Sequence, residues 1–331
     1  MSVAAERLAP GSGAIPEIEQ RRDKESYEEL IQRLSVQSVR KHYDAYADID
    51  WDAPEMQIAR DDPRFELPPD DSLGGTEWYK SQPQSVRAEI GLNAFASAMK
   101  MGVVFENVLK RGLLEYAFRL PNRSPEFRYA YHEVIEEAQH SLMFQEFINR
   151  SGEGPGRLPW HLELGTRFVV RLGRVFPALF FFFVLGGEEP IDFAQKRALR
   201  RGHVPHPLIK RIMQIHITEE ARHLCFARNY LQKNVPQLGW FARLRLMIAV
   251  PFILGEMARL MLEPSHGTIR RFRIPAAVVR EAYSHNREHK RRVRQSLAGV
   301  AGLCIQLALV NKRSVWVWRA LGLGNPFRYA A

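Results

Sequence analysis

Residues 216–223 read HITEEARH and residues 133–140 read EVIEEAQH, so the chain carries the pattern Glu-Glu-Ala-x-His twice. Each residue of an α-helix advances by about 100°, so side chains three or four positions apart lie on one face. In each copy, the second glutamate and the final histidine are three positions apart and can point the same way. The repeated pattern therefore predicts two helices that each present a carboxylate and an imidazole to a shared interior.

The donors of these two helices are Glu137 and His140 in the first copy, and Glu220 and His223 in the second. His216, four positions before Glu220, adds a third donor on the same face of the second helix. A single Glu-x-x-His pair often arises by chance and is explained by a surface ion pair. Two copies on separate long helices are the arrangement that a carboxylate-bridged dinuclear metal site in a four-helix bundle requires.

Such a site also needs one inward glutamate from each of the two other helices. Glu106 lies within the apolar segment MGVVFENVL and is the candidate before the first pair, whereas Glu115 lies nearer the helix end, where solvent is expected. Before the second pair, the apolar run FFFFVLGG leads directly to Glu188 and Glu189. We favour Glu188, which Asp192 one turn later could support, and the sequence leaves Glu189 as the alternative.

The first glutamate of each doublet, Glu136 or Glu219, lies four positions before the histidine and could also face it. Because the pair spaced by three recurs in both copies, we expect Glu136 and Glu219 to face solvent or to support the metal ligands from outside. Glu133, which stands where the second copy has a histidine, is expected to be an acid on the helix face. The predicted metal ligands are therefore Glu106, Glu137, His140, Glu188 or Glu189, His216, Glu220 and His223.

In their order and spacing, these ligands resemble those of the ferritin-like non-haem di-iron oxygenases. The additional histidine, His216, narrows the resemblance to the p-aminobenzoate N-oxygenase family, whose members oxidise aryl amines to nitro compounds. The resemblance covers roughly residues 90–235 through the ligand motifs and extends more loosely to about residue 325. It implies a pair of iron ions, with manganese as a substitute, O₂ as co-substrate, an external electron donor and a small-molecule amine substrate. No catalytic residue beyond the metal ligands is carried over.

The rest of the sequence predicts an all-α fold, a ferritin-like four-helix bundle core with additional helices. Residues 1–86 are expected to form a mobile tail (1–25), one helix (26–45) and an irregular wrap rich in Asp and Pro (46–86), ahead of a helical di-iron domain over 87–325. Within that domain, helices are expected at 87–119, 125–151, 157–186, 187–202, 206–234, 238–263, 275–310 and 314–321.

Composition limits the cellular setting and the partners. Cys225 and Cys304 lie in apolar surroundings and are expected to be free thiols in a reducing cytoplasm. The apolar run 175–187 is too short to span a bilayer and no signal peptide is visible, so neither membrane insertion nor export is expected. The formal net charge is +10, but no nucleic-acid motif accompanies the basic segment 285–295, so a solvated helix face is expected there.

Two other functions use the same kind of site. A di-iron hydroxylase or desaturase whose substrate is tethered to an acidic carrier protein would explain the charge of +10. A ferritin- or rubrerythrin-like protein that handles iron or peroxide is disfavoured by His216, because ferroxidase sites use oxygen ligands that let iron pass through. The sequence leaves the oligomeric state open, with a homodimer among the options.

Several apolar side chains are expected near the ligands. Most of them should belong to the core and the others to the wall of a pocket. They are Phe105, Met143, Phe144, Phe147 and 180–183.

Overall fold

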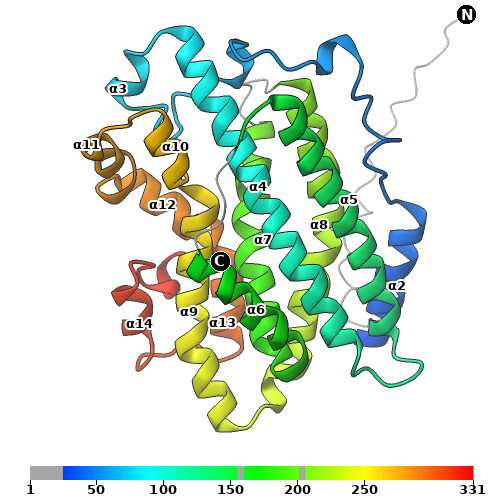
Figure 1. The fold of residues 1–331 in the computed structure, drawn as a ribbon. Helices are drawn as coiled ribbons and strands as arrows, with labels where there is room; N and C mark the ends of the chain where they lie inside the picture. The colour runs from blue at the N-terminus through cyan, green and yellow to red at the C-terminus, as the bar shows by residue number, and fades with distance from the viewer. Residues whose placement is uncertain (1–24, 155–159, 201–205, 331) are drawn as a thin grey trace, which may run out of the picture.

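The computed structural model describes residues 25–154, 160–200 and 206–330, and every regular element within these ranges is helical. The core consists of four long helices, α4 (Gln84–Ala117), α5 (Pro125–Ser151), α7 (Pro177–Arg200) and α8 (Pro207–Asn234). They lie side by side in Figure 1, with α2 (Tyr27–Arg40) packed against α5 and α8 along one edge. The predicted all-α bundle with additional helices is confirmed. Apart from Glu25, the tail expected at 1–25 lies outside the described residues.

The ends of α5 follow from local sequence signals. The helix begins with Pro125 at its first position, after Ser124, where the missing N–H of proline has no cost. It ends at Gly152, whose φ of 62° is in the left-handed region that a residue without Cβ adopts readily. The helix predicted at 125–151 is therefore confirmed. The first helix, α2, begins at a capping box and ends at Arg40, short of its expected end.

The helix break that the sequence predicts just before Glu188 is placed incorrectly. Helices were expected at 157–186 and 187–202, but the break falls at Pro177, between α6 (Trp160–Val175) and α7. Proline lacks the N–H of a helix interior and disfavours the helical conformation in the residue before it, so a new helix starts there. The Gly-Gly-Glu-Glu-Pro segment continues α7 with Pro190 inside the helix, because every residue from 178 to 190 is buried among neighbouring helices.

The single helix expected at 275–310 is also divided. The Asn286 side chain accepts hydrogen bonds from the amides of Glu288 and His289, and this cap starts a new helix. That helix carries the basic segment, and only His289 and Ser296 of its ten residues are buried. The elements after α8 are α9 (Trp240–Leu262), α10 (His266–Arg271), α11 (Ala276–Val279), a π turn (Arg280–Ser284), α12 (Arg287–Ser296), α13 (Ala298–Gln306) and α14 (Val315–Ala320).

The segment between α2 and α4, residues 41–83, is called the wrap from here on and includes most of the stretch expected to be irregular. Its regular elements are short, namely two 3₁₀ turns (Pro54–Met56 and Pro63–Phe65) and α3 (Glu77–Lys80). Phe65 is fully buried, and its carbonyl oxygen would lie 1.7 Å from a Cβ at Gly91 of α4. The wrap is therefore held against the bundle at a contact that only glycine allows.

Two apolar clusters fill the bundle, and a polar layer separates them. On α5, the buried members of one cluster end at Ala130 and those of the other begin at Met143. On α8, the corresponding boundary runs from Ile215 to Phe226. Both copies of the repeated Glu-Glu-Ala-x-His pattern lie within these gaps. The fold therefore places the predicted donors in a layer with dry packing on both sides.

The contact between α4 and α6 generates a stability prediction. A Cβ at Gly173 would lie 2.0 Å from the carbonyl oxygen of Gly112, and backbone cannot move aside as a side chain can. We expect Gly173→Ala to lower the free energy of unfolding by about 1–3 kcal/mol, measured by denaturant titration. Gly165→Ala on the same helix meets nothing within 4 Å. This control should be neutral or should stabilise the protein by about 0.5–1 kcal/mol, and equal effects of both substitutions would contradict the close approach.

Candidate metal centre

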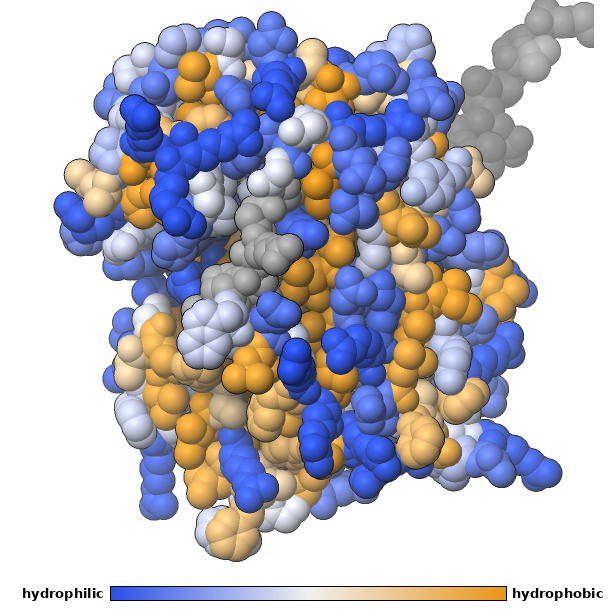
Figure 2. Space-filling view, viewed as in Figure 1, coloured by the Kyte–Doolittle hydropathy of each residue, from blue (hydrophilic) through white to orange (hydrophobic). Residues whose placement is uncertain are grey.

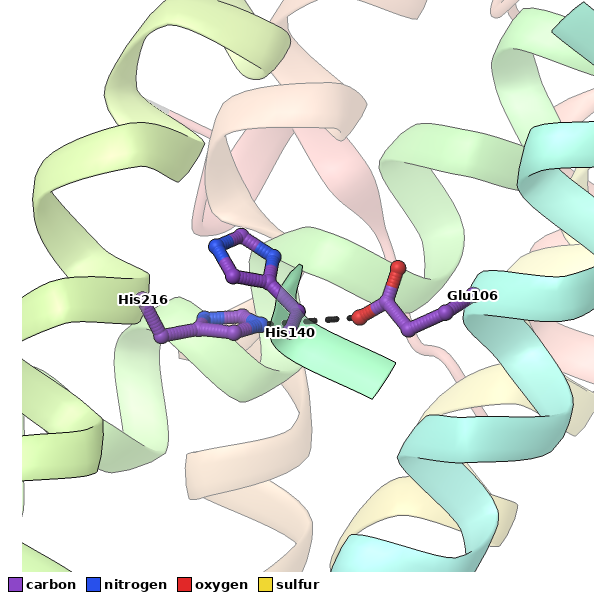
Figure 3. Close-up of side chains that lie close together, drawn as sticks. All are labelled: Glu106, His140 and His216. Carbon is purple, nitrogen blue, oxygen red and sulfur yellow. Dashed lines mark ion pairs between the residues drawn. The ribbon is translucent and has the colours of Figure 1, made fainter. Parts of the chain in front are cut away.

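The predicted ligands converge in the interior of the bundle from α4, α5, α7 and α8. Glu106, His140 and His216 form one group, whose donor atoms lie within 4.8 Å of one another and which Figure 3 shows facing a common point. The dashed line there joins His216 Nε2 to Glu106 Oε1 at 3.7 Å. Four further groups meet the same limit, namely Glu133–Glu137–His223, Glu137–His140–Glu220, Glu188–His216–Glu220 and Glu106–Glu137–Glu188. All of these side chains are buried.

The structure distinguishes between Glu188 and Glu189 as the candidate ligand on α7. Glu188 is fully buried and points into the cluster of predicted ligands. The Glu189 carboxylate instead accepts hydrogen bonds from Arg228 at 2.5 Å and from the Val300 amide at 2.8 Å. Asp192 does not support Glu188 as expected, because its carboxylate pairs with a lysine one turn further along α7. Of the two alternatives, Glu188 is therefore the one that lies among the other donors.

The two Glu-x-x-His pairs have the geometry that their spacing predicted. His140 Nδ1 lies 3.1 Å from Glu137 Oε2, and His223 Nδ1 lies 3.1 Å from Glu220 Oε1. The pairs also approach each other across the bundle, since His223 Nδ1 is 2.9 Å from Glu137 Oε1. In both histidines the Nδ1 atom therefore faces the carboxylates, and Nε2 points outward.

The first glutamate of each doublet binds the histidine of the opposite helix. Glu219 Oε2 lies 2.8 Å from His140 Nε2, and Glu136 Oε2 lies 2.7 Å from His223 Nε2. Arg222 lies near both acids, 2.8 Å from Glu136 and 3.6 Å from Glu219. Both glutamates are buried, so the solvent-facing alternative was wrong. A carboxylate that holds the outer nitrogen fixes the imidazole tautomer and leaves the inner nitrogen free for a metal.

The wrap completes this support with contacts that the sequence analysis missed. The backbone amide of Tyr43 donates to Glu219 Oε1 at 3.1 Å. Gln139, which precedes the histidine of the first copy, accepts from the Ala45 amide at 2.9 Å and donates to Asp44 at 3.1 Å. Backbone donors carry no signal in the sequence, so only the repeated glutamate of each doublet could have indicated a supporting layer.

Many polar atoms of the cluster have no hydrogen-bond partner in the described part of the chain. They include both carboxylate oxygens of Glu106 and Glu188, both ring nitrogens of His216, and one oxygen each of Glu137 and Glu220. Burying an ionised group without compensation costs several kcal/mol per ion. Metal ions would supply that compensation, and a set of carboxylates with imidazoles suits iron or manganese. The residues present therefore fit a dinuclear metal centre.

Burial and mutual repulsion shift the pKa values of these groups. Burial raises the pKa of Glu106 and of Glu188 well above the usual range, and the neighbouring carboxylates raise both further. Burial lowers the pKa of His216 well below its usual value, with the nearby His140 adding to the effect. For His140, burial acts in the same direction, but contacts with Glu137 and other acids outweigh it and raise the pKa to about 10. His216 is therefore a neutral imidazole, the form that binds a metal.

The aromatic side chains named from the sequence are buried in the two apolar clusters. Phe144 lies closest to the donors, with its ring centroid 5.5 Å from that of His216 and 6.3 Å from that of His140. Phe105 packs on Phe183 at 5.2 Å. These rings keep the surroundings of the donors apolar.

Glu133 is not the helix-face acid that the sequence indicated. Its side chain is fully buried, and its carboxylate lies within 4.8 Å of the donor atoms of Glu137 and His223. Burial raises its pKa well above the usual range. The sequence shows only that Glu133 lies on α5, whereas α2, α4 and α8 determine which faces of that helix are covered.

An all-α bundle in which four helices direct carboxylates and imidazoles to one interior site defines the ferritin-like di-iron class of proteins. The chain belongs to the P-aminobenzoate N-oxygenase AurF family, whose sequence model matches residues 24–307. The family consists of di-iron oxygenases, so the chain is an oxygenase-type enzyme.

Two mycobacterial proteins are similar to the chain over most of its length. It is 38% identical over 308 residues to "Uncharacterized protein Rv0885" of Mycobacterium tuberculosis (strain ATCC 25618 / H37Rv), covering 93% of this chain and 91% of the relative. The same figures hold for "Uncharacterized protein Mb0909" of Mycobacterium bovis. No solved structure is significantly similar to the chain. Among the described helices, none is long and apolar enough to cross a membrane.

The crossed support of the histidines can be tested by substitution. Glu219→Ala leaves the outer nitrogen of His140 without its carboxylate, so we expect the affinity for Fe(II) to fall by about 10–100-fold. Anaerobic titration of the metal-free protein measures this affinity. Glu115→Ala, on α4 outside the cluster, should bind as the wild type does. An unchanged affinity in a folded Glu219→Ala variant would show that the contact does not position the imidazole.

Proposed function

We propose that the chain is a non-haem di-iron N-oxygenase that uses O₂ and external electrons to oxidise an aryl amine to a nitro or hydroxylamine product. The observation that carries this proposal is His216, a third imidazole among the same carboxylates. The match to the N-oxygenase family over residues 24–307 supports it independently. The additional neutral donor also argues against an iron store, whose sites favour oxygen ligands.

The ligand assignment follows from which donors lie together. Glu106, His140 and His216 would hold one ion. His223 would hold the other together with Glu188, which interacts electrostatically with it and whose carboxylate also lies in one group with His216 and Glu220. Glu137 belongs to three of the groups, and Glu220 lies with His140 in one group and with Glu188 in another, so both carboxylates would serve the two ions. When bound, the iron pair supplies the electrons that reduce O₂.

The remaining residues of the centre position the ligands and exclude water. The two apolar clusters on either side of the polar layer keep it dry, and a dry site strengthens every electrostatic contact within it. Glu136 and Glu219 hold protons at the outer nitrogens of His223 and His140, so that the Nδ1 atoms stay free.

A substrate tethered to an acidic carrier protein is the second candidate, and a surface groove favours it. The groove lies between α4 and α6, and Figure 2 shows hydrophilic and hydrophobic side chains interleaved on the lower half of the molecule, where Figure 1 places α6 and α9. One acid, Glu115, faces the groove among five arginines, Arg111, Arg119, Arg167, Arg171 and Arg174. Such a surface would attract an acidic protein, with a strong dependence on salt.

The N-oxygenase proposal predicts a defined iron content and activity. Protein reconstituted anaerobically with Fe(II) should hold close to two irons per chain and should oxidise p-aminobenzoate or a related aryl amine when O₂ and a reductant are added. His216→Ala should keep the wild-type melting temperature of the metal-free protein but lose at least about 10-fold in turnover. Mass spectrometry of the products measures turnover. Less than about half an iron per chain, or full turnover by His216→Ala, would refute the proposal.

The two candidate substrates respond differently to a change in the groove. In the Arg167→Glu, Arg171→Glu double variant, both exposed cations become acids far from the proposed ligands. If the substrate is a free aryl amine, turnover should stay within about 2-fold of wild type and should be insensitive to salt. The KM for a carrier-tethered substrate would instead rise by at least about 10-fold, and that rise would favour the second candidate.

A further inference from the structure

Glu133 opens the first copy of the repeated pattern at the position where His216 opens the second. Each lies four residues before a ligand glutamate and seven before a ligand histidine, so each belongs to the donor face of its helix. The ring centroid of His216 is 4.7 Å from that of His140. The Glu133 carboxylate lies within 4.8 Å of the donor atoms of His223 and Glu137. Each opening residue thus approaches the final histidine of the opposite helix.

No hydrogen bond among the described residues compensates the charge of Glu133. Its side chain is 0% exposed, and neither carboxylate oxygen has a hydrogen-bond partner among the described residues. The guanidinium of Arg222, the cation of this layer, contacts Glu136 and Glu219 instead. Tyr129, one turn earlier on α5, is also fully buried, and its hydroxyl has no partner in the described chain. A buried carboxylate without a donor lowers stability unless a cation binds it.

We propose that Glu133 is an additional ligand of the metal ion that His223 binds. The inference rests on the proposed di-iron function and extends its ligand set by one carboxylate. The two ions would then differ in their donors, because the ion near His140 receives the neutral imidazole of His216 and the ion near His223 receives a negative oxygen. A carboxylate is the harder donor and binds a cation of higher charge more strongly.

The charge of the ligand set links this difference in donors to the reduction potential of the centre. The carboxylates of Glu106, Glu137, Glu188 and Glu220 together balance two divalent ions. The negative charge of Glu133 exceeds that balance, and it is compensated better when the ions are trivalent. Glu133 therefore stabilises the oxidised pair relative to the reduced pair, and its removal should raise the reduction potential of the centre.

Anaerobic Fe(II) titration of Glu133→Gln tests the assignment. Glutamine keeps the shape of the side chain and removes its charge. We expect the first equivalent of Fe(II) to bind as in the wild type, at the donors around His140, and the second to bind at least about 10-fold more weakly. Tyr129→Phe, which removes the nearby hydroxyl and leaves the carboxylate, should bind both equivalents normally.

The melting temperature of metal-free Glu133→Gln shows whether Glu133 is a metal ligand or an acid that the fold itself requires. Because the Glu133 carboxylate has no donor, Glu133→Gln should melt at the same temperature as the wild type or higher when metal is absent. The increase in melting temperature on adding Fe(II) should be smaller than for the wild type. Glu133→Leu should show the same pattern. A metal-free variant that is unfolded would overturn the proposal, since it would assign the carboxylate a structural role.

The outcomes also separate this inference from the proposed function. If the wild type and Glu133→Gln both bind two irons with equal affinity and equal reduction potential, Glu133 is not a ligand and the di-iron function stands. If the variant loses both equivalents alike, the assignment to the ion near His223 is wrong. If the wild type itself binds no iron, the function and the inference fail together.

Discussion

The structure depends on one constraint, the burial of a dense layer of carboxylates and imidazoles between two apolar clusters. Each ionised group in such a layer loses several kcal/mol of hydration, which the protein must compensate by contacts or by bound cations. Among the described residues, Arg222 binds the supporting acids Glu136 and Glu219, and the imidazoles of His140 and His223 contact Glu137 and Glu220. The inner acids Glu106 and Glu188 have no such partner. The residues of this layer therefore fit the pair of metal ions that the family implies.

The crossed contacts between the two helices explain why each copy of the repeated pattern contains two glutamates. The second glutamate of each copy faces the interior beside the histidine of its own helix. The first holds the histidine of the opposite helix, as Glu136 does for His223 and Glu219 does for His140. Each helix thus orients the donors of the other, and the wrap fastens the arrangement through the amide of Tyr43.

Helical spacing was sufficient to predict the donors that lie within one helix. Glu137 with His140 needed only the rise of an α-helix and a second copy to distinguish the pair from chance. Glu188 was favoured over Glu189 because Asp192 was expected to support it, but Asp192 pairs with a lysine instead. Adjacent residues differ mainly in which neighbouring helix they face, and the sequence does not show that. Glu133 was misjudged for the same reason, since its burial depends on helices that pack against α5. The helix break at Pro177 was missed because the Gly-Gly pair before Glu188 is the stronger turn signal in the sequence.

The central claim is that the layer holds a pair of metal ions between the four helices. X-ray diffraction at the iron absorption edge, from crystals of protein reconstituted anaerobically with Fe(II), tests it most directly. We expect two anomalous peaks within the cluster, one beside His140 and His216 and the other beside His223 and Glu188. A single peak, or peaks outside the cluster while Glu106 and Glu137 remain unbound, would contradict it.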